Sequence, residues 1–275
     1  MTKRQKIVLY LIFAICIIIA CSTLVQNKKT NRKIQVAKPV ETEQPTNTTK
    51  ANNNHFNYLT FAPSVKNKVY QYRYFTLEYN EKHEQASWVY YLLTSDFING
   101  TAKRKDNFRE DPNITTKSAT LSDYKKSGYD RGHLCPAGDM KLNKTSMSET
   151  FYMSNMSPQL PGLNRGEWKR LESKVRKWAI EEDSLLIVTG PIFKNNLGYI
   201  GKEKVTIPGY YYKVIYDITP PQKMTAFVLP HIQKLNPYFK YQTSVDKVEE
   251  MTGIDFFSFL NDDIEASLEA NIQWK

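Results

Sequence analysis

Hydrophobic and polar positions alternate in two tyrosine-rich segments near the start of the folded part of the chain. Residues 69–79 and 86–93 are rich in Tyr, Val and Leu, and the polar turn of residues 80–84 separates them. Such alternation is typical of β-strands, because successive side chains of a strand point to opposite faces of a sheet. We therefore expect a β-hairpin here.

Later segments predict more strands and several helices. Residues 184–191 form a continuous apolar run that ends at Gly-Pro, which favours a central strand. We also expect a hairpin over 121–133, strands at 152–156, 211–216 and 223–229, and helices at 146–151, 164–182 and 245–252. Strands and helices do not alternate regularly, which indicates an α+β fold with a sheet core flanked by helices.

The helix expected to begin at Asn164 has one apolar face. Trp168, Leu171, Val175 and Trp178 recur at helical spacing, which predicts core residues rather than aromatics that stack on bases.

The first 54 residues have a different pattern from the rest of the chain. A basic segment precedes an apolar run, residues 7–20, which ends at Ala20-Cys21. The run is short for a spanning helix but typical of a secretion signal, and a small residue before a cysteine resembles a bacterial lipobox. We expect residues 1–21 to be a signal, residues 22–54 a disordered polar tether and residues 55–275 one domain.

This pattern predicts an exported protein that is attached to the membrane through a lipidated Cys21. An uncleaved N-terminal anchor and ordinary secretion are the alternatives, and all three interpretations place the domain outside the cytoplasm. For residues 22–54, an ordered arm along the domain is the alternative to a tether. The domain holds one cysteine, Cys135, and no Cys-x-x-Cys pair, which argues against a structural zinc site.

Positive charge is unevenly distributed. The chain has a net charge of +10. Residues 1–54 hold nine basic and two acidic side chains, and therefore account for +7 of that net charge. Within the domain the most positive segment is residues 101–170, with thirteen basic and eight acidic side chains. A polyanionic substrate requires such a segment, so nucleic acid, DNA or RNA, is the expected partner.

Residues 128–172 carry the candidate chemistry. Hydrolysis of a phosphodiester requires a base, a divalent cation and cationic side chains that hold the phosphate. His133 supplies a base that is largely neutral at an ordinary pKa of ~6.5, and Arg131 supplies a phosphate clamp. Mg²⁺ commonly takes only one or two protein ligands, so the amide oxygen of Asn164 is a sufficient anchor. Arg176 follows Glu172 at the spacing of a helix ion pair, which would fix that carboxylate.

Several linked motifs carry a family resemblance. They are Asp130-Arg131-Gly132-His133, then Ser154-Asn155-Met156-Ser157-Pro158-Gln159, then Asn164 through Trp168 to Leu171-Glu172. In this order they resemble the DNA/RNA non-specific endonucleases, a family that includes secreted bacterial sugar-non-specific nucleases and mitochondrial endonuclease G. The resemblance implies an antiparallel sheet with a ββα-metal element that carries the histidine and the asparagine.

The resemblance also implies a role for each residue. His133 would be the general base, Asn164 the ligand of Mg²⁺ (Mn²⁺ or another divalent cation being the alternatives), and Glu172 a carboxylate acting on metal-bound water. Arg131 would contact the phosphate, and Asn155 and Arg176 would support substrate binding. The family has a further upstream basic residue, for which residues 103–109 offer four candidates, and we favour Arg104.

Each assignment has a simpler alternative. Asp130-Arg131-Gly132 fits a surface turn with an incidental histidine, and Asn164 with Glu167 fits a helix N-cap with a capping acid. Glu172 and Arg176 fit a solvated ion pair, and we expect His83 and His231 to be ordinary surface residues.

Three other classes of protein also remain open. One is a tethered, non-catalytic nucleic-acid-binding protein, and another is a cysteine hydrolase built on Cys135 and His133. The third is a toxin nuclease with an inhibitor protein as its partner.

Overall fold

The computed structural model describes residues 62–272 and 274. The expected signal, residues 1–21, and the expected tether, residues 22–54, therefore lie outside the described residues. The chain divides into two units, Met1–Asn54 and His55–Lys275, and all described residues belong to the second. Within the described part, no helix has both the length and the apolarity needed to cross a membrane.

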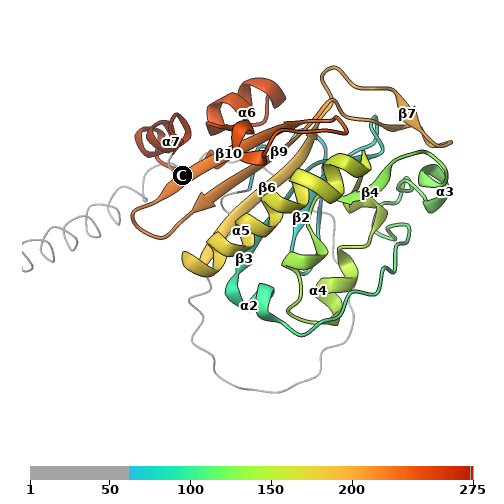
Figure 1. Ribbon diagram of the computed structural model, residues 1–275, viewed down its shortest axis with the longest axis horizontal. Coiled ribbons are helices and arrows are strands. Elements are labelled where there is room, and N and C mark those ends of the chain that lie inside the picture. The colour runs from blue at the N-terminus through green and yellow to red at the C-terminus, as the bar shows by residue number, and fades with distance from the viewer. Residues whose placement is uncertain (1–61, 273, 275) are drawn as a thin grey trace, which may run out of the picture. The chain divides into compact units, whose positions relative to one another are not determined.

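A seven-stranded sheet forms the centre of the described domain (Figure 1). Each of its neighbouring pairs is antiparallel. In spatial order the strands are β1 (Lys68–Gln71), β2 (Thr76–Asn80), β3 (Gln85–Thr94), β6 (Ser184–Ile192), β9 (Tyr210–Asp217), β10 (Lys223–Pro230) and β11 (Gln242–Thr243). The apolar run expected to be a central strand is β6, which lies between β3 and β9.

The two faces of the sheet bury different helices. Leu185 and Ile187 of β6 face a core shared with α5 (Lys169–Glu181). The intervening Leu186 and Val188 face a second core, shared with α6 (Val245–Thr252) and α7 (Asp262–Glu269). Both faces of this strand are therefore buried, which explains why its sequence is apolar throughout rather than alternating.

Short elements connect the sheet to the site. The helices are α2 (Ser95–Asn99), α3 (Leu121–Tyr124) and α4 (Lys144–Glu149), and the 3₁₀ turns are η2 (Ala137–Asp139), η3 (Met153–Asn155) and η5 (Tyr238–Tyr241). Two further strands, β7 (Tyr199–Ile200) and β8 (Val205–Thr206), pair with each other.

A second two-stranded sheet precedes α5. Strand β4 (Asp130–His133) pairs antiparallel with β5 (Met156–Gln159), and the π-helical segment η4 (Leu163–Trp168) then leads into α5. This order of strand, excursion, strand and helix is the expected ββα element. The apolar residues of the last helix, Trp168, Leu171, Val175 and Trp178, are buried against the sheet as predicted.

Several expected boundaries are wrong. Residues 69–79 form two strands rather than one, because the backbone N–H of Tyr72 donates to Phe75 O across a tight turn at 2.9 Å. Residues 121–133 are not a hairpin. The side chains of Thr120 and Asp123 form a capping box, which stabilises the short helix α3 in place of a first strand.

Candidate active site

His133 ends strand β4 and packs between two phenylalanine rings. Its ring centroid lies 5.6 Å from that of Phe108 and 5.0 Å from that of Phe151, the latter in an edge-to-face arrangement. Nε2 is buried without a hydrogen-bond partner, whereas Nδ1 is not among the buried unpaired atoms of the described residues. An N–H faces aromatic rings more favourably than a lone pair does, so we infer the Nε2–H tautomer, which leaves the lone pair of Nδ1 accessible.

The surroundings of His133 keep its imidazole neutral. Burial lowers the pKa of His133 to about 3, and the positive charges of Arg104 and Arg131 contribute. The expectation of an ordinary pKa is therefore wrong for the domain without nucleic acid. The lone pair is available at neutral pH, and a bound phosphate would raise the basicity of the ring by offsetting the two arginines.

Gly132 sets how closely β4 approaches β5. A Cβ atom at this position would lie 2.3 Å from the side chain of Gln159, which is fully buried. A larger residue therefore does not fit between Arg131 and His133. The Asp-Arg-Gly-His segment is a paired strand rather than an ordinary surface turn.

Asn164 lies inside a helical segment rather than at its N-cap. Its backbone N–H donates to Leu160 O at 2.9 Å, so the capping alternative is wrong. The side-chain Nδ2 donates to Asp130 Oδ2 at 2.9 Å. Because the amide nitrogen is engaged in this way, Oδ1 is the atom of Asn164 left to bind a ligand.

Asp130 also accepts two hydrogen bonds from Arg165, at 2.8 Å and 2.6 Å. Although burial acts in the opposite direction, the bonds from Arg165 and Asn164 lower the pKa of Asp130.

The helix that contains Asn164 is irregular, because Gly166 has the non-helical dihedrals φ −99° and ψ −115°. Single π-helical turns of this kind are frequent at functional sites.

The start of this helix is held by a buried histidine. The backbone N–H of Leu160 donates to Nε2 of His231 at 2.8 Å, and Nδ1 of His231 lies 2.7 Å from Pro208 O. His231 is only 2% exposed, so the expectation of a plain surface residue is wrong. His83 is also not a plain surface residue, because its ring stacks on Phe193 at a centroid distance of 3.7 Å.

Glu172 and Arg176 do not form the expected ion pair. Arg176 Nη1 donates to Asp139 Oδ1 at 2.7 Å, and the other carboxylate oxygen of Asp139 accepts from the Tyr91 hydroxyl at 2.8 Å. Asp139 is fully buried, so its carboxylate needs a charged partner in place of water, and Arg176 supplies it. Among the described residues, no side chain hydrogen-bonds the Glu172 carboxylate.

The Glu172 carboxyl is held close to neutrality. Burial and then the negative charge of Asp139 raise its pKa to about 7, while the positive charge of Lys213 acts in the opposite direction. Lys213 is buried in β9 and donates to Thr189 Oγ1 at 2.5 Å. Sequence reasoning missed Lys213, although a lysine within the apolar strand Tyr210–Asp217 was a usable signal of a buried charge.

Two arginines are held over the aromatic rings beside His133. The guanidinium of Arg131 lies 4.0 Å from the centre of the Phe108 ring, and that of Arg104 lies 5.0 Å from the centre of the Phe151 ring. A guanidinium stacked in this way keeps N–H groups at its edge for an anion. Arg104 Nε already donates to Asp106 Oδ1 at 2.6 Å, whereas no carboxylate among the described residues hydrogen-bonds Arg131.

These side chains meet at one cavity of about 460 Å³. Six of the residues predicted from the sequence line it: Arg104, Arg131, His133, Asn164, Glu172 and Arg176. Lys169 also lines it and was missed, although it lies one helical turn before Glu172 and so on the same face.

Asn155 does not line this cavity. It is fully buried, and its amide bonds to the backbone N–H and C=O of Cys135, at 2.8 and 3.0 Å, and to Thr150 O at 2.8 Å. Its complete burial contradicts a direct contact with substrate. The side chain instead holds the segment that follows His133.

Two other groups do not belong to the site. Burial raises the pKa of the Cys135 thiol well above its usual value, and this residue does not line the cavity, so a cysteine hydrolase is not supported. Asp246, Glu249 and Glu269 form an acidic cluster on α6 and α7, away from the residues that line the cavity.

Comparison with known proteins decides the family. Residues 52–263 match the family model of the DNA/RNA non-specific endonucleases. The chain belongs to this family. It is therefore a nuclease of the expected class, and the expected α+β fold with a ββα element is confirmed.

Individual members of the endonuclease family are similar over most of the domain. A nuclease of Nostoc sp. is 35% identical over 211 residues, which cover 72% of this chain and 76% of the relative. Nuclease C1 of Cunninghamella echinulata is 35% identical over 205 residues, or 68% of this chain and 81% of the relative. Human mitochondrial endonuclease G is 30% identical over 198 residues, or 66% of this chain and 67% of the relative.

A solved structure shares the fold of this endonuclease domain. The crystal structure of the EndoG/EndoGI complex superposes with a TM-score of 0.67 at 28% identity, and the match covers 71% of this chain and 88% of that chain.

Proposed function

We propose that the domain hydrolyses phosphodiester bonds of DNA and RNA with His133 as general base and a divalent cation, Mg²⁺, at Asn164. The observation that carries this proposal is the convergence of the residues His133, Asn164, Arg104 and Arg131 on one cavity. General bases and oxygen ligands are the groups that this reaction requires.

The oxygen donors of the cavity fit a hard cation. Asn164 Oδ1 and the carboxylate of Glu172 are free of hydrogen bonds within the described part of the chain, and both residues line the same cavity. Oxygen donors of this kind suit Mg²⁺ and Mn²⁺, and they do not suit the thiolate sites of zinc. When bound, the cation would neutralise charge that develops on the phosphate and the leaving oxygen.

The remaining steps belong to the side chains. Nδ1 of His133 accepts the proton of the attacking water, and its low pKa ensures that this nitrogen is unprotonated at neutral pH. Arg131 and Arg104 hold non-bridging oxygens of the phosphate, because both guanidinium groups lie stacked on rings beside His133. Arg104 engages Asp106 through Nε alone, which leaves its terminal N–H groups for the phosphate. Glu172 orients water, and Arg176 and Asn155 position the elements around it.

The decisive experiment compares the full chain with two histidine variants. We expect cleavage of plasmid DNA and structured RNA in Mg²⁺, loss of cleavage in EDTA, and recovery when Mg²⁺ is restored. His133→Ala should lose activity by 100-fold or more, on the order expected for removal of a general base. His83→Ala is the matched control, since His83 lies outside the cavity. Full activity of His133→Ala would remove the imidazole from the mechanism.

We also propose that the protein is an exported lipoprotein anchored at Cys21. The support is the apolar run of residues 7–20 and the small residue before the cysteine. Detergent phase partition of cells that express the wild type and Cys21→Ala tests it. Movement of the variant alone from the detergent phase to the aqueous phase is expected, and an unchanged distribution would contradict lipidation.

An inhibitor protein is a further proposed partner. EndoGI forms a complex with EndoG in the structure that resembles this domain. Such an inhibitor would cover the cavity of His133. A co-purified protein that lowers the rate of plasmid cleavage would reveal it. Unaltered activity of the endogenous preparation after chromatography in high salt would argue against a bound inhibitor.

A further inference from the structure

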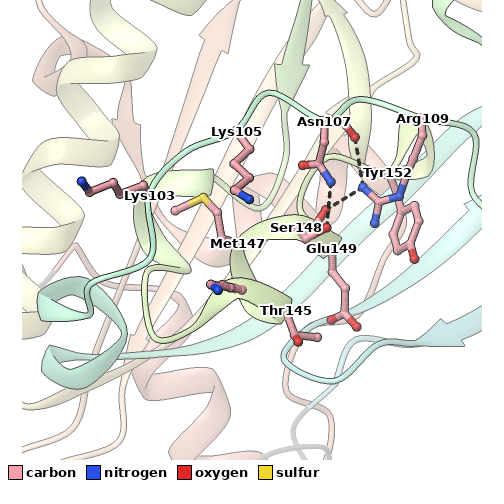
Figure 2. Close-up of a pocket in the computed structure, with 10 residues that line it drawn as sticks. Lys103, Lys105, Asn107, Arg109, Thr145, Met147, Ser148, Glu149 and Tyr152 are labelled. Atoms are coloured by element: carbon pink, nitrogen blue, oxygen red, sulfur yellow. Dashed lines mark hydrogen bonds between the residues drawn. The ribbon is translucent and has the colours of Figure 1, made fainter.

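A second cavity is lined by the residues that flank Arg104 in the chain, Lys103 and Lys105, among others (Figure 2). It measures about 440 Å³ and is formed by the loop of residues 103–109 on one side and by helix α4 on the other. Three lysines and one arginine line it, namely Lys103, Lys105, Lys144 and Arg109. A single acidic residue, Glu149, lies among them. The cavity is therefore predominantly cationic.

The loop separates this cavity from the active site. Its odd-numbered residues, Lys103, Lys105, Asn107 and Arg109, line the second cavity. Its even-numbered residues, Arg104, Asp106 and Phe108, line the opposite side together with Arg131 and Asn164. One short segment thus presents positive charge in two directions, with Arg104 on the catalytic side and two lysines on the other.

Hydrogen bonds hold this loop in place. Asn107 Nδ2 donates to Ser148 Oγ at 2.8 Å, and Arg109 Nη1 donates to the carbonyl oxygens of Asn107 and Ser148, both at 3.0 Å (Figure 2). The guanidinium of Arg109 also lies 4.0 Å from the centre of the Tyr152 ring. The wall of the cavity is therefore organised before any ligand binds, which lowers the cost of binding.

The three lysines of the cavity carry charge that the domain does not neutralise. Lys103, Lys105 and Lys144 are exposed, and within the described ranges none of them makes a hydrogen bond or an ion pair. The carboxylate of Glu149 accepts a hydrogen bond from the backbone N–H of Arg73 at 3.3 Å. Cations gathered without anionic partners favour an anionic ligand.

We propose that this second cavity binds the phosphate backbone of the nucleic acid outside the phosphate that is cleaved. The inference rests on the proposed function, because it assigns a further contact to the same substrate. The loop that holds Arg104 at the catalytic cavity holds Lys103 and Lys105 at this one, so a strand that passes over the loop meets both. Lysines contact phosphates without reading bases, which suits a nuclease of low sequence preference.

The contact makes cleavage depend on substrate length. A long strand reaches both cavities, whereas a small diester such as bis(4-nitrophenyl) phosphate reaches only the catalytic one. Loss of the lysines should therefore weaken the binding of long substrates and leave the turnover of the small diester unchanged.

The test uses the full chain with Lys103, Lys105 and Lys144 replaced by alanine together. The matched control replaces Lys202, Lys240 and Lys247, which are also exposed but line neither cavity. For plasmid DNA we expect KM to rise by about tenfold or more with kcat retained. The salt dependence of binding should weaken, with the slope of log K against log salt falling by about 2 to 3 because each lost phosphate contact removes about 0.9. The control triple variant should match the wild type in both measurements.

A second measurement separates this inference from the proposed function. In a His133→Ala background without divalent cation, fluorescence anisotropy of a labelled DNA strand measures binding without cleavage. Weaker binding and a smaller salt slope in the triple lysine variant support the second cavity even where catalysis is absent. An unchanged slope and affinity would overturn it. Inorganic phosphate at millimolar concentration should displace DNA less effectively from the protein that lacks the three lysines, so equal displacement from His133→Ala with and without the triple replacement would also overturn it.

Discussion

Asp130 Oδ2 accepts a hydrogen bond of 2.9 Å from Asn164 Nδ2 and so joins the strand that carries His133 to the helix that carries the amide. The two residues are 34 positions apart in the sequence. This bond determines which atom of the Asn164 amide is free, because a nitrogen that donates to a carboxylate leaves only the oxygen for a cation. The carboxylate thus orients a cation ligand without touching the cation.

Replacement of Asp130 should weaken binding of the divalent cation. Asp130→Ala removes the acceptor of the Asn164 amide, and we expect a 10-fold to 100-fold loss of Mg²⁺ affinity or activity, the range seen when such supporting partners are removed. Asp130→Asn keeps an acceptor oxygen and should lose less. Activity measured across a Mg²⁺ titration gives the result. Equal Mg²⁺ dependence of the wild type and Asp130→Ala would contradict this role.

The low pKa of His133 predicts a pH dependence of stability. The unfolded chain binds a proton at His133 below ~6.5, whereas the folded domain does so only below about 3. The stabilising contribution is therefore present above pH ~6.5 and is lost as the pH falls towards about 3. Relative to His133→Phe, the wild type should lose at most ~1.4 kcal/mol per pH unit over that window. Urea unfolding of both proteins between pH 7 and pH 4 measures the difference, and parallel curves would refute it.

Glu172 predicts the opposite trend. Its folded pKa of about 7 lies above the usual value, so its favourable contribution is complete at low pH and is lost as the pH rises through about 7. Without divalent cations, Glu172→Gln should be more stable than the wild type at pH 8, by on the order of 1 kcal/mol after allowance for partial exposure.

Divalent cation should reverse this difference. Mg²⁺ at pH 8 should raise the Tm of the wild type more than that of Glu172→Gln, because only the carboxylate gains a cation. Equal shifts in the two proteins would show that Glu172 does not interact with the cation.

Asn155 should act on stability and not on substrate contact. Asn155→Ala leaves the N–H and C=O of Cys135 and the carbonyl of Thr150 without their partners in a fully buried region. Each unsatisfied buried group costs about 1–3 kcal/mol, so we expect a loss of roughly 3 to 5 kcal/mol in the free energy of unfolding. KM of the remaining folded protein at low temperature should be unchanged. A raised KM in a protein of normal stability would instead indicate contact with substrate.

Local patterns in the sequence predicted the elements and most residues of the site. Alternation identified strands such as β3, helical spacing identified the buried face of α5, and linked motifs identified His133 and Asn164. The capping box at Thr120 was also present in the sequence, but its signal competed with that of a strand and was missed. These features depend on residues within a few positions of one another, which is why the sequence alone can specify them.

Tertiary structure decided the partners and the electrostatics. Arg176 pairs with Asp139 instead of Glu172, and the charge of Lys213, buried in a strand of the central sheet, acts on the pKa of Glu172. The low pKa of His133 depends on burial between Phe108 and Phe151, which lie on separate segments. Spacing along the chain carries no information about which distant groups will meet. Desolvation and Coulomb interactions are set by distances in space, so only the folded domain determines them.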